Sequence, residues 1–162
     1  MPVNNFHHQI QYFEQICKSA GLKVTHQRLE IYHELLKAHD HPSAEALYKR
    51  LGKRLPSLSL DTVYRTLATF EKLKLAHRVD TAESQARFEA ITARHHHFLC
   101  SACGQLVDFF WQDFDDVLLP SDLTTIGSVD CTKVVAHGTC VVCTRKTQRS
   151  DKGGQAAFSL SS

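Results

Sequence analysis

Two pairs of cysteines stand in the second half of the chain, Cys100 with Cys103 and Cys140 with Cys143. A two-residue gap lets both sulfurs of a pair turn toward one ion, and Gly104 relaxes the turn after the first pair. Two such pairs supply the four thiolates that suit structural zinc, an interpretation favoured over four buried or redox-active thiols. Their wide separation predicts that the second pair comes from a later strand and ties the end of its domain to the middle.

A run of three histidines lies just before the first cysteine pair. His95 and His97 alternate, so on a strand they point to the same face, while His96 points to the other. Two imidazoles on one face can form half of a second metal site. Glu89 and Asp108, on neighbouring expected strands, could add oxygen ligands, and such a mixed shell suits Fe(II), Mn(II) or Zn(II). For this run taken alone, a solvated histidine tract is an equally open alternative.

The composition sets the broad class. Of 162 residues, 43% are hydrophobic and 22% charged, which is average for a soluble globular protein and excludes a chain disordered throughout. No apolar run is long enough for a transmembrane helix, and the first residues lack the pattern of a signal peptide, so we expect a cytoplasmic protein. Clustered cysteine and histidine then favour metal over disulfides. The two isolated cysteines, Cys17 and Cys131, are expected to be small core residues.

The first half of the chain has the pattern of short helices followed by a hairpin. Four apolar stripes at helical spacing predict the helices, and Gly21 closes the first of them as a left-handed residue. The three helices that follow have polar N-cap candidates at Thr25, Ser43 and Ser59. Residues 76–80 and 87–91 then flank a polar turn at 81–85. Helices followed by such a hairpin give the order of a winged helix-turn-helix unit.

The helix after Ser59 turns a polar face outward, since its apolar stripe faces the core. On that face Arg65 can fork onto guanine or phosphate, Tyr64 can contact a thymine methyl or a phosphate, and Thr62 can donate to phosphate. A basic cluster precedes this helix, and residues 1–94 hold 14 Lys and Arg against 10 Asp and Glu. A solvated helix face is the alternative for this helix alone, and the winged-helix order weakens that alternative.

The second half mixes strands with one helix. Residues 95–100 and 106–110 are expected strands around the turn at Cys103 and Gly104, and residues 130–136 are another. Residues 113–119 can form a short helix that ends at Pro120. From Thr144 onward the chain is polar, and we expect a disordered tail.

Taken together, these residues resemble the ferric uptake regulator (Fur) family of bacterial metal-dependent repressors. The resemblance rests on residues 21–28 (GLKVTHQR), 41–48 (HPSAEALY), 59–67 (SLDTVYRTL) and 95–104 (HHHFLCSACG) with 140–143 (CVVC). It implies an α+β fold, with a winged-helix DNA-binding domain at 1–92, an α/β dimerisation domain at 93–145 and a tail at 146–162. It also implies a homodimer that binds an inverted-repeat operator in double-stranded DNA, without a role at a membrane.

The resemblance also assigns roles to residues. Structural Zn²⁺ would be bound by Cys100, Cys103, Cys140 and Cys143. A regulatory site for Fe²⁺ or Mn²⁺, with Zn²⁺ as a further option, would bridge the two domains through His41, Glu89, His95, His97 and Asp108. DNA would be contacted by Lys23, Arg28, Thr62, Tyr64 and Arg65. A further metal site found in several members is not expected, because Arg94 and Thr132 stand where many of them have histidine.

The branch of the family stays open between iron and peroxide sensing. The helix motifs and Asp108 look most like the peroxide-responsive repressors, which use bound iron to oxidise their own histidine ligands. Glu89 stands where those proteins have aspartate and where iron-uptake regulators have glutamate. A zinc or manganese sensor is an alternative within the family.

We expect a regulator rather than an enzyme. One alternative is a zinc-dependent hydrolase that uses His95 and His97 with Glu89 as general base, but the chain has no HExxH motif and no evident nucleophile. The other is a thiol redox protein, but the cysteine pairs lack the strand, CxxC, helix context of such proteins.

Overall fold

The computed structural model describes residues 6–79, 86–90, 93–129 and 131–153, and the predicted turn at 81–85 lies outside these residues. The chain divides into two compact units, Met1–Arg94 and His95–Ser162, and each is described by itself. Among the described residues, no helix is both long and apolar enough to cross a bilayer.

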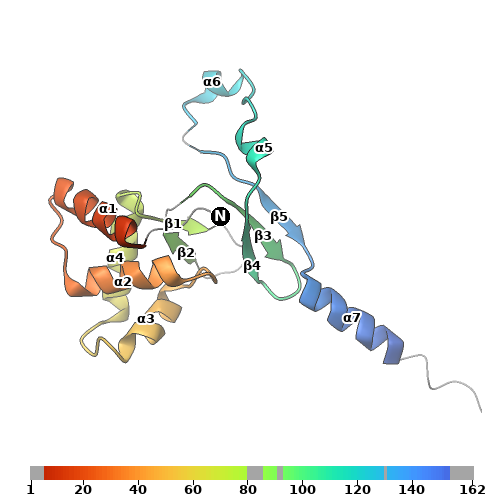
Figure 1. Ribbon diagram of the computed structural model, residues 1–162, viewed down its shortest axis with the longest axis horizontal. Coiled ribbons are helices and arrows are strands. Elements are labelled where there is room, and N and C mark those ends of the chain that lie inside the picture. The colour runs from red at the N-terminus through yellow and green to blue at the C-terminus, as the bar shows by residue number, and fades with distance from the viewer. Residues whose placement is uncertain (1–5, 80–85, 91–92, 130, 154–162) are drawn as a thin grey trace, which may run out of the picture. The chain divides into compact units, whose positions relative to one another are not determined.

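The first unit is four helices followed by a hairpin (Figure 1). The helices are α1 (Phe6–Ser19), α2 (His26–Lys37), α3 (Ala44–Gly52) and α4 (Leu60–Lys72). The hairpin strands are β1 (Ala76–Val79) and β2 (Arg87–Ala90), which pair antiparallel. This is the predicted order of a winged helix-turn-helix unit.

The helices of this unit begin and end where the local chemistry predicts. The side chains of Thr25, Ser43 and Ser59 each accept a hydrogen bond from the backbone N–H three residues later, at 3.1–3.3 Å. Gly21 follows α1 with φ of +66°, the left-handed conformation that glycine adopts without strain.

Three aromatic rings form the centre of the first unit. Phe13 of α1 stacks on Tyr32 of α2 at 4.6 Å between ring centroids, and the edge of Phe70 of α4 meets both rings at 5.5 and 5.7 Å. Cys17 is fully buried in the same cluster, as predicted. Because α4 buries Val63, Leu67 and Phe70 against this cluster, its opposite face is left for solvent or a partner.

The second unit is built on a three-stranded sheet in the order β4-β3-β5. Its strands are β3 (His96–Cys100), β4 (Leu106–Phe109) and β5 (Val135–Gly138). β4 runs antiparallel to β3 after a tight turn, whereas β5 runs parallel to it. β4 and β5 therefore run in opposite directions on either side of β3, and the connection between them leads from one side of β3 to the other. That connection carries the short helices α5 (Gln112–Asp115) and α6 (Leu123–Ile126), and helix α7 (Val141–Gly153) follows β5 (Figure 1).

Several predicted elements of the second unit differ in extent from the structure. The helix expected at 113–119 is the single turn α5, whose N-cap position, Trp111, makes no side-chain capping bond. The last strand is β5 at 135–138 rather than 130–136, because its register is set by pairing with β3. Helix α6 was not predicted.

Two predictions about cysteine and the tail also differ. Cys131 is exposed, so it is not a core residue. Helix α7 includes residues 146–153 of the expected tail, and residues 154–162 lie outside the described residues. The hydroxyls of Thr144 and Thr147 in this helix donate to the carbonyls four residues earlier, and Arg145, Lys146 and Gln148 are good helix formers despite their polarity.

Candidate metal centres and DNA-binding face

Strand pairing brings the two cysteine pairs together. β3 ends at Cys100, and Gly104 closes the following turn with φ of +69° and a hydrogen bond from its N–H to the Cys100 carbonyl. The parallel partner β5 places Gly138 beside Cys100, so two residues later the chain delivers Cys140 to the same turn. Helix α7 then begins and presents Cys143 on its first turn. The second pair therefore comes from a later strand, as its separation in the sequence predicts.

The four sulfurs have the spacing of a zinc site. All four lie within 4.8 Å of one another, and Cys103 Sγ is 3.9 Å from Cys140 Sγ. Four sulfurs placed tetrahedrally at about 2.3 Å from one zinc ion are about 3.8 Å apart. All six cysteines of the chain are free thiols, so disulfide pairing does not compete for these sulfurs. The donor set and its spacing fit structural zinc.

Electrostatics in this cluster favour a bound cation. The backbone N–H of Cys140 donates to Cys100 Sγ at 3.3 Å, which lowers the pKa of Cys100 to about 6. The thiol of Cys143 donates to Cys140 and Cys103, which raises the pKa of Cys143 to about 12. Four thiolates this close repel one another, so without a cation some of them hold protons. A divalent ion replaces those protons and removes the repulsion.

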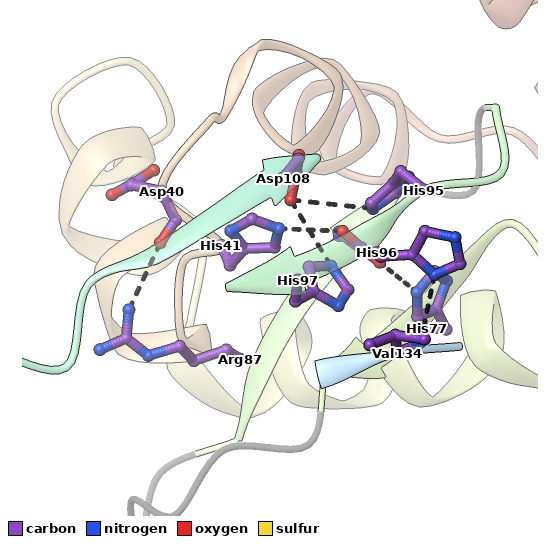
Figure 2. Close-up of polar contacts among 10 residues, drawn as sticks. Asp40, His41, His77, Arg87, His95, His96, His97, Asp108 and Val134 are labelled. Atoms are coloured by element: carbon purple, nitrogen blue, oxygen red, sulfur yellow. Dashed lines mark hydrogen bonds and ion pairs between the residues drawn. The ribbon is translucent and has the colours of Figure 1, made fainter. Parts of the chain in front are cut away.

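The second unit also brings together His95, His97 and Asp108. His97 on β3 lies directly opposite Asp108 on β4. Asp108 Oδ1 is 3.5 Å from His97 Nε2 and 3.8 Å from His95 Nε2 (Figure 2). Both histidines are buried, and their rings meet edge to face at 5.0 Å. The three side chains form one group of two nitrogens and one oxygen, called here the histidine half-site.

His96 points the other way and has a structural environment. It is fully buried, its Nδ1 accepts from the Val134 N–H at 3.1 Å, and its Nε2 is 3.2 Å from Asp115 Oδ1. The rings of Phe109 and Phe114 pack on it. His96 thus links β3 to the segment before β5 and to α5, outside the histidine half-site.

The first unit holds two further predicted ligands. His41 and Glu89 are 3% and 8% exposed, and His41 Nε2 is 2.9 Å from Glu89 Oε2. A buried carboxylate needs hydrogen bonds or an ion, and this imidazole supplies one contact. His41 and Glu89 are called here the glutamate half-site.

Backbone and side-chain contacts hold the His41 loop against β2. The Phe88 N–H donates to the Pro42 carbonyl at 3.1 Å, and the Arg87 guanidinium donates to the Asp40 carbonyl at 3.5 Å. The Asp40 carboxylate pairs through both oxygens with Arg50 of α3, which lowers the pKa of Asp40. His41 itself has φ of +48°, a left-handed conformation that is uncommon for residues with a side chain. These contacts fix its ring toward Glu89.

A residue that the sequence interpretation missed, His77, also reaches this carboxylate. His77 lies opposite Glu89 in the β1–β2 register, and its Nε2 contacts Glu89 Oε1 (Figure 2). Alternation and pairing in the predicted hairpin are the signal that could have found it, had the register across the turn been known.

The predicted DNA-contacting residues lie on the first unit. Arg65 is exposed on α4, 3.8 Å from Asp61 one turn earlier. The Tyr64 hydroxyl donates to Glu45 of α3, and Thr62 exchanges a hydrogen bond with the cap residue Ser59.

A hollow of about 450 Å³ lies between the start of α2 and the outer face of α4. Its lining residues are Thr25, Gln27, Arg28, Thr62, Arg65, Thr66, Ala68, Thr69 and Lys72. The lining combines three cations with hydroxyl groups and includes no carboxylate, which is the chemistry that binds phosphate. Arg28 is oriented by a 2.6 Å hydrogen bond to the Lys23 carbonyl. The structure thus brings Arg28, Thr62 and Arg65 together, with Lys23 beside them, whereas the Tyr64 hydroxyl is held by α3.

Comparison with known proteins identifies the family. Residues 19–119 match the Ferric uptake regulator family. The chain belongs to this family. The peroxide operon regulator of Bacillus subtilis is 30% identical over 139 residues, which cover 86% of this chain and 96% of that protein.

Solved Fur structures share the fold. The ferric uptake regulator from Pseudomonas aeruginosa with manganese is 27% identical, with a TM-score of 0.63 over 79% of this chain and 97% of that one. The Helicobacter pylori ferric uptake regulator, described with three functional metal binding sites, gives a TM-score of 0.69 at 21% identity over 86% and 94% of the two chains. The predicted fold class and the resemblance to the Fur family, including its peroxide-responsive branch, are confirmed.

The four-cysteine cluster generates a first prediction. We expect Cys140→Ser to lose bound zinc and to lower the free energy of unfolding by more than about 4 kcal/mol, because zinc binding contributes directly to folding here. Metal content by mass spectrometry and thermal unfolding measure both effects. Cys131→Ser, which changes an exposed cysteine outside the cluster, is the control and should match the parent. A stable, dimeric Cys140→Ser protein without zinc would contradict this prediction.

Proposed function

We propose that this Fur family member is a homodimeric transcriptional repressor that binds an inverted-repeat operator when a regulatory metal joins its two half-sites. The observation that carries the proposal is the presence of two clustered ligand groups, one in each unit: the buried glutamate half-site, and the histidine half-site with two buried imidazoles and the exposed Asp108. Membership of the Fur family supports both the repressor activity and the dependence on metal.

The spacing within each half-site supports metal binding. Two ligand atoms that are each about 2.1 Å from one ion can be at most about 4.2 Å apart, and about 3.0 Å apart at a right angle. His41 Nε2 and Glu89 Oε2 are 2.9 Å apart, and the Asp108 oxygen is 3.5 and 3.8 Å from its two imidazoles. Neither half-site alone offers the ligands of a closed shell, and nitrogen with carboxylate oxygen suits Fe(II) or Mn(II), with Zn(II) as a further option.

Divided ligands explain how metal could control DNA binding. An ion bound by both half-sites would fix the angle between the DNA-binding unit, proposed as residues 1–92, and the dimerisation unit, proposed as 93–145. In the dimer, a fixed angle lets two copies of α4 enter successive major grooves of an inverted repeat. Metal and DNA then increase each other's affinity by the same factor.

Exposed apolar residues support dimerisation through the second unit. Phe110, Val117, Leu118 and Ile126 are 59–93% exposed, a degree of apolar exposure that favours burial against a partner. Structural zinc in the cysteine cluster would hold β5 and α7 to the sheet. Because operator DNA is the proposed ligand, we place the protein in the cytoplasm.

The polar hollow beside α4 supports the proposed DNA contacts. Arg65 would read a base edge or a phosphate, and Thr62 would donate to phosphate. Tyr64, the residue before Arg65 on α4, would contact a thymine methyl or a phosphate. Lys23, which precedes α2, and Arg28, in the first turn of α2, would neutralise adjacent phosphates of the DNA backbone.

An enzymatic function has less support. The proposed general base of a hydrolase, Glu89, is contacted by an imidazole on each carboxylate oxygen, so it has little access to a water molecule. The two cysteine pairs face each other around one point rather than forming two separate dithiols, which disfavours redox catalysis.

The histidine half-site generates a prediction for metal response. We expect His97→Ala to keep the fold and the structural zinc but to weaken Mn(II)-dependent operator binding by more than about 100-fold, beyond the range typical of outer-shell changes. Mobility-shift titrations at fixed DNA and increasing Mn(II) measure this. His137→Ala removes an exposed histidine of the same sheet and should behave as the parent. Equal metal dependence in the two variants would contradict the prediction.

Arg65 generates a prediction for DNA recognition. We expect Arg65→Ala to lose about 1–3 kcal/mol of operator binding if the side chain reads a base, with specificity relaxed at one position. If Arg65 instead contacts a phosphate, its loss would weaken binding to all DNA sequences evenly and reduce the salt dependence of binding. Lys37→Ala removes one exposed charge at the far end of α2 and is the control. Undiminished binding of operator and random DNA by Arg65→Ala would show that α4 faces elsewhere.

Glu89 generates a prediction for the choice between iron and peroxide sensing. With Fe(II) bound between these imidazoles, added peroxide would oxidise one of them by two electrons: one peroxide oxygen would be inserted at a ring carbon and the other would leave as water. We expect Glu89→Asp to gain that oxygen on His95 or His97 severalfold faster than the parent. Aspartate is one methylene shorter than glutamate, so its carboxylate would bind the iron differently and change which coordination position is open to peroxide.

The test is anaerobic loading with Fe(II), a peroxide pulse, and peptide mass analysis, with DNA binding measured in parallel. Glu71→Asp, an exposed carboxylate outside the half-sites, is the control. If the parent is oxidised as fast as Glu89→Asp, residue 89 does not set the chemistry and the parent is itself a peroxide sensor.

A further inference from the structure

Glu89 lies between two imidazoles, one on each carboxylate oxygen. His41 Nε2 is 2.9 Å from Oε2, and His77 Nε2 contacts Oε1 (Figure 2). The Glu89 side chain is only 9% exposed, so water competes little for either oxygen. Both contacts are therefore made to a buried carboxylate, unlike surface ion pairs, which contribute little to stability.

The position of His77 is set by the hairpin. β1 and β2 are antiparallel, and His77 is directly opposite Glu89. Side chains opposite each other on one face of such a pair have Cβ atoms about 4.5–5.5 Å apart, which leaves the imidazole within reach of the carboxylate. Both strands belong to the first unit, so this contact exists without any contribution from the second.

The chemistry of the two imidazoles differs. His41 comes from the loop before α3 and is a ligand of the proposed regulatory site. His77 has no such role in that site, and its Nε2 contacts Oε1, where an imidazole N–H can donate. A hydrogen bond from that N–H uses a lone pair of Oε1, so this oxygen becomes a poorer metal ligand while its partner Oε2 keeps its lone pairs.

We propose that His77 is a positioning residue that holds Oε1 of Glu89 and thereby makes Glu89 bind the regulatory metal through Oε2 alone. This inference rests on the proposed function, since it takes Glu89 as a ligand of that metal. With one oxygen from Glu89, the predicted ligand set supplies at most five atoms if Asp108 also binds through one oxygen. If Oε1 were released from His77, Glu89 could bind the metal through both oxygens and supply a sixth ligand atom. Coordination number is one of the features by which proteins select among divalent ions. His77 therefore tunes the metal preference of the site.

Two variants separate the hydrogen bond from simple packing. His77→Leu removes the donor and keeps comparable bulk. His77→Gln keeps an N–H donor at the same number of bonds from Cβ. Arg78→Leu is the matched control, because Arg78 is the next residue of β1, is exposed and lies opposite Phe88 rather than Glu89. Each variant is prepared as the full chain with one zinc ion retained, which confirms that the second unit is folded.

Cobalt(II) is the probe, because its visible absorption weakens as its coordination number rises. We expect His77→Leu to show weaker visible bands than the parent and about tenfold weaker Co(II) binding, the scale typical of losing an outer-shell hydrogen bond. His77→Gln and Arg78→Leu should keep the parent spectrum. The lack of thiolate-to-cobalt absorption in the near ultraviolet verifies that cobalt has not entered the cysteine cluster.

The outcomes are distinct. An unchanged spectrum for His77→Leu, with or without weaker binding, would overturn the role of His77, because a merely structural residue leaves the coordination number unchanged. If Glu89→Ala binds Co(II) with the affinity and spectrum of the parent, Glu89 is not a ligand and the proposed regulatory site itself fails. In the metal-free protein, nitrogen NMR should find a proton on His77 Nε2. A bare Nε2 would also overturn the inference, because it cannot donate to a carboxylate.

Discussion

The pairing of β3 with both of its neighbours is the constraint on which both metal centres of the second unit depend. The antiparallel register with β4 sets Asp108 opposite His97, and the parallel register with β5 sets the second cysteine pair beside Cys100. Since successive side chains alternate, a slip of one residue would turn the histidines to the wrong face and carry the cysteines out of reach. A short sheet of three strands has little core to resist such a slip, and four sulfurs bound to one ion would oppose it strongly. By fixing the register at one end of β3, zinc in the cysteine cluster would also keep the residues of the histidine half-site, at the other end of β3, on the correct face.

The glutamate half-site solves a different problem, which is how to keep a carboxylate buried whether or not metal is bound. Glu89 is contacted by His41 on one oxygen and by His77 on the other, so both oxygens of the buried carboxylate have a polar partner in the metal-free site. When an ion takes Oε2 and His41, the contact with His77 can persist. Only one of the two hydrogen bonds is exchanged for metal, which limits the reorganisation that binding requires. The loop of His41 is already fixed by Asp40, Arg50 and Arg87, which reduces the conformational entropy lost on binding.

Local chemistry made much of this predictable from sequence. The helix caps at Thr25, Ser43 and Ser59 and the left-handed Gly21 depend on a few neighbouring atoms, and the structure has all four as expected. The spacing of the CxxC pairs is short-range information of the same kind. The predictions that were wrong or missing concern features that depend on residues distant in the sequence. The bounds of β5 follow from its pairing with β3. The exposure of Cys131 depends on how the segment before β5 is held, and there the Val134 N–H donates to His96 Nδ1. His77 was missed for the same reason, since its partner is set by the hairpin register.

Splitting the regulatory ligands between two units is what would make metal an effective switch in the proposed mechanism. A ligand shifts a conformational equilibrium only by the difference between its affinities for the two states, and a change from 1:99 to 99:1 requires about 5.5 kcal/mol of such difference. If one unit held every ligand, the ion would bind equally well at any angle between the units and would shift nothing. With His41 and Glu89 on one unit and His95, His97 and Asp108 on the other, an ion in the open arrangement can use only two or three protein ligands. The ligands gained on closure then supply the difference in affinity. The two half-sites therefore have to be weak when apart.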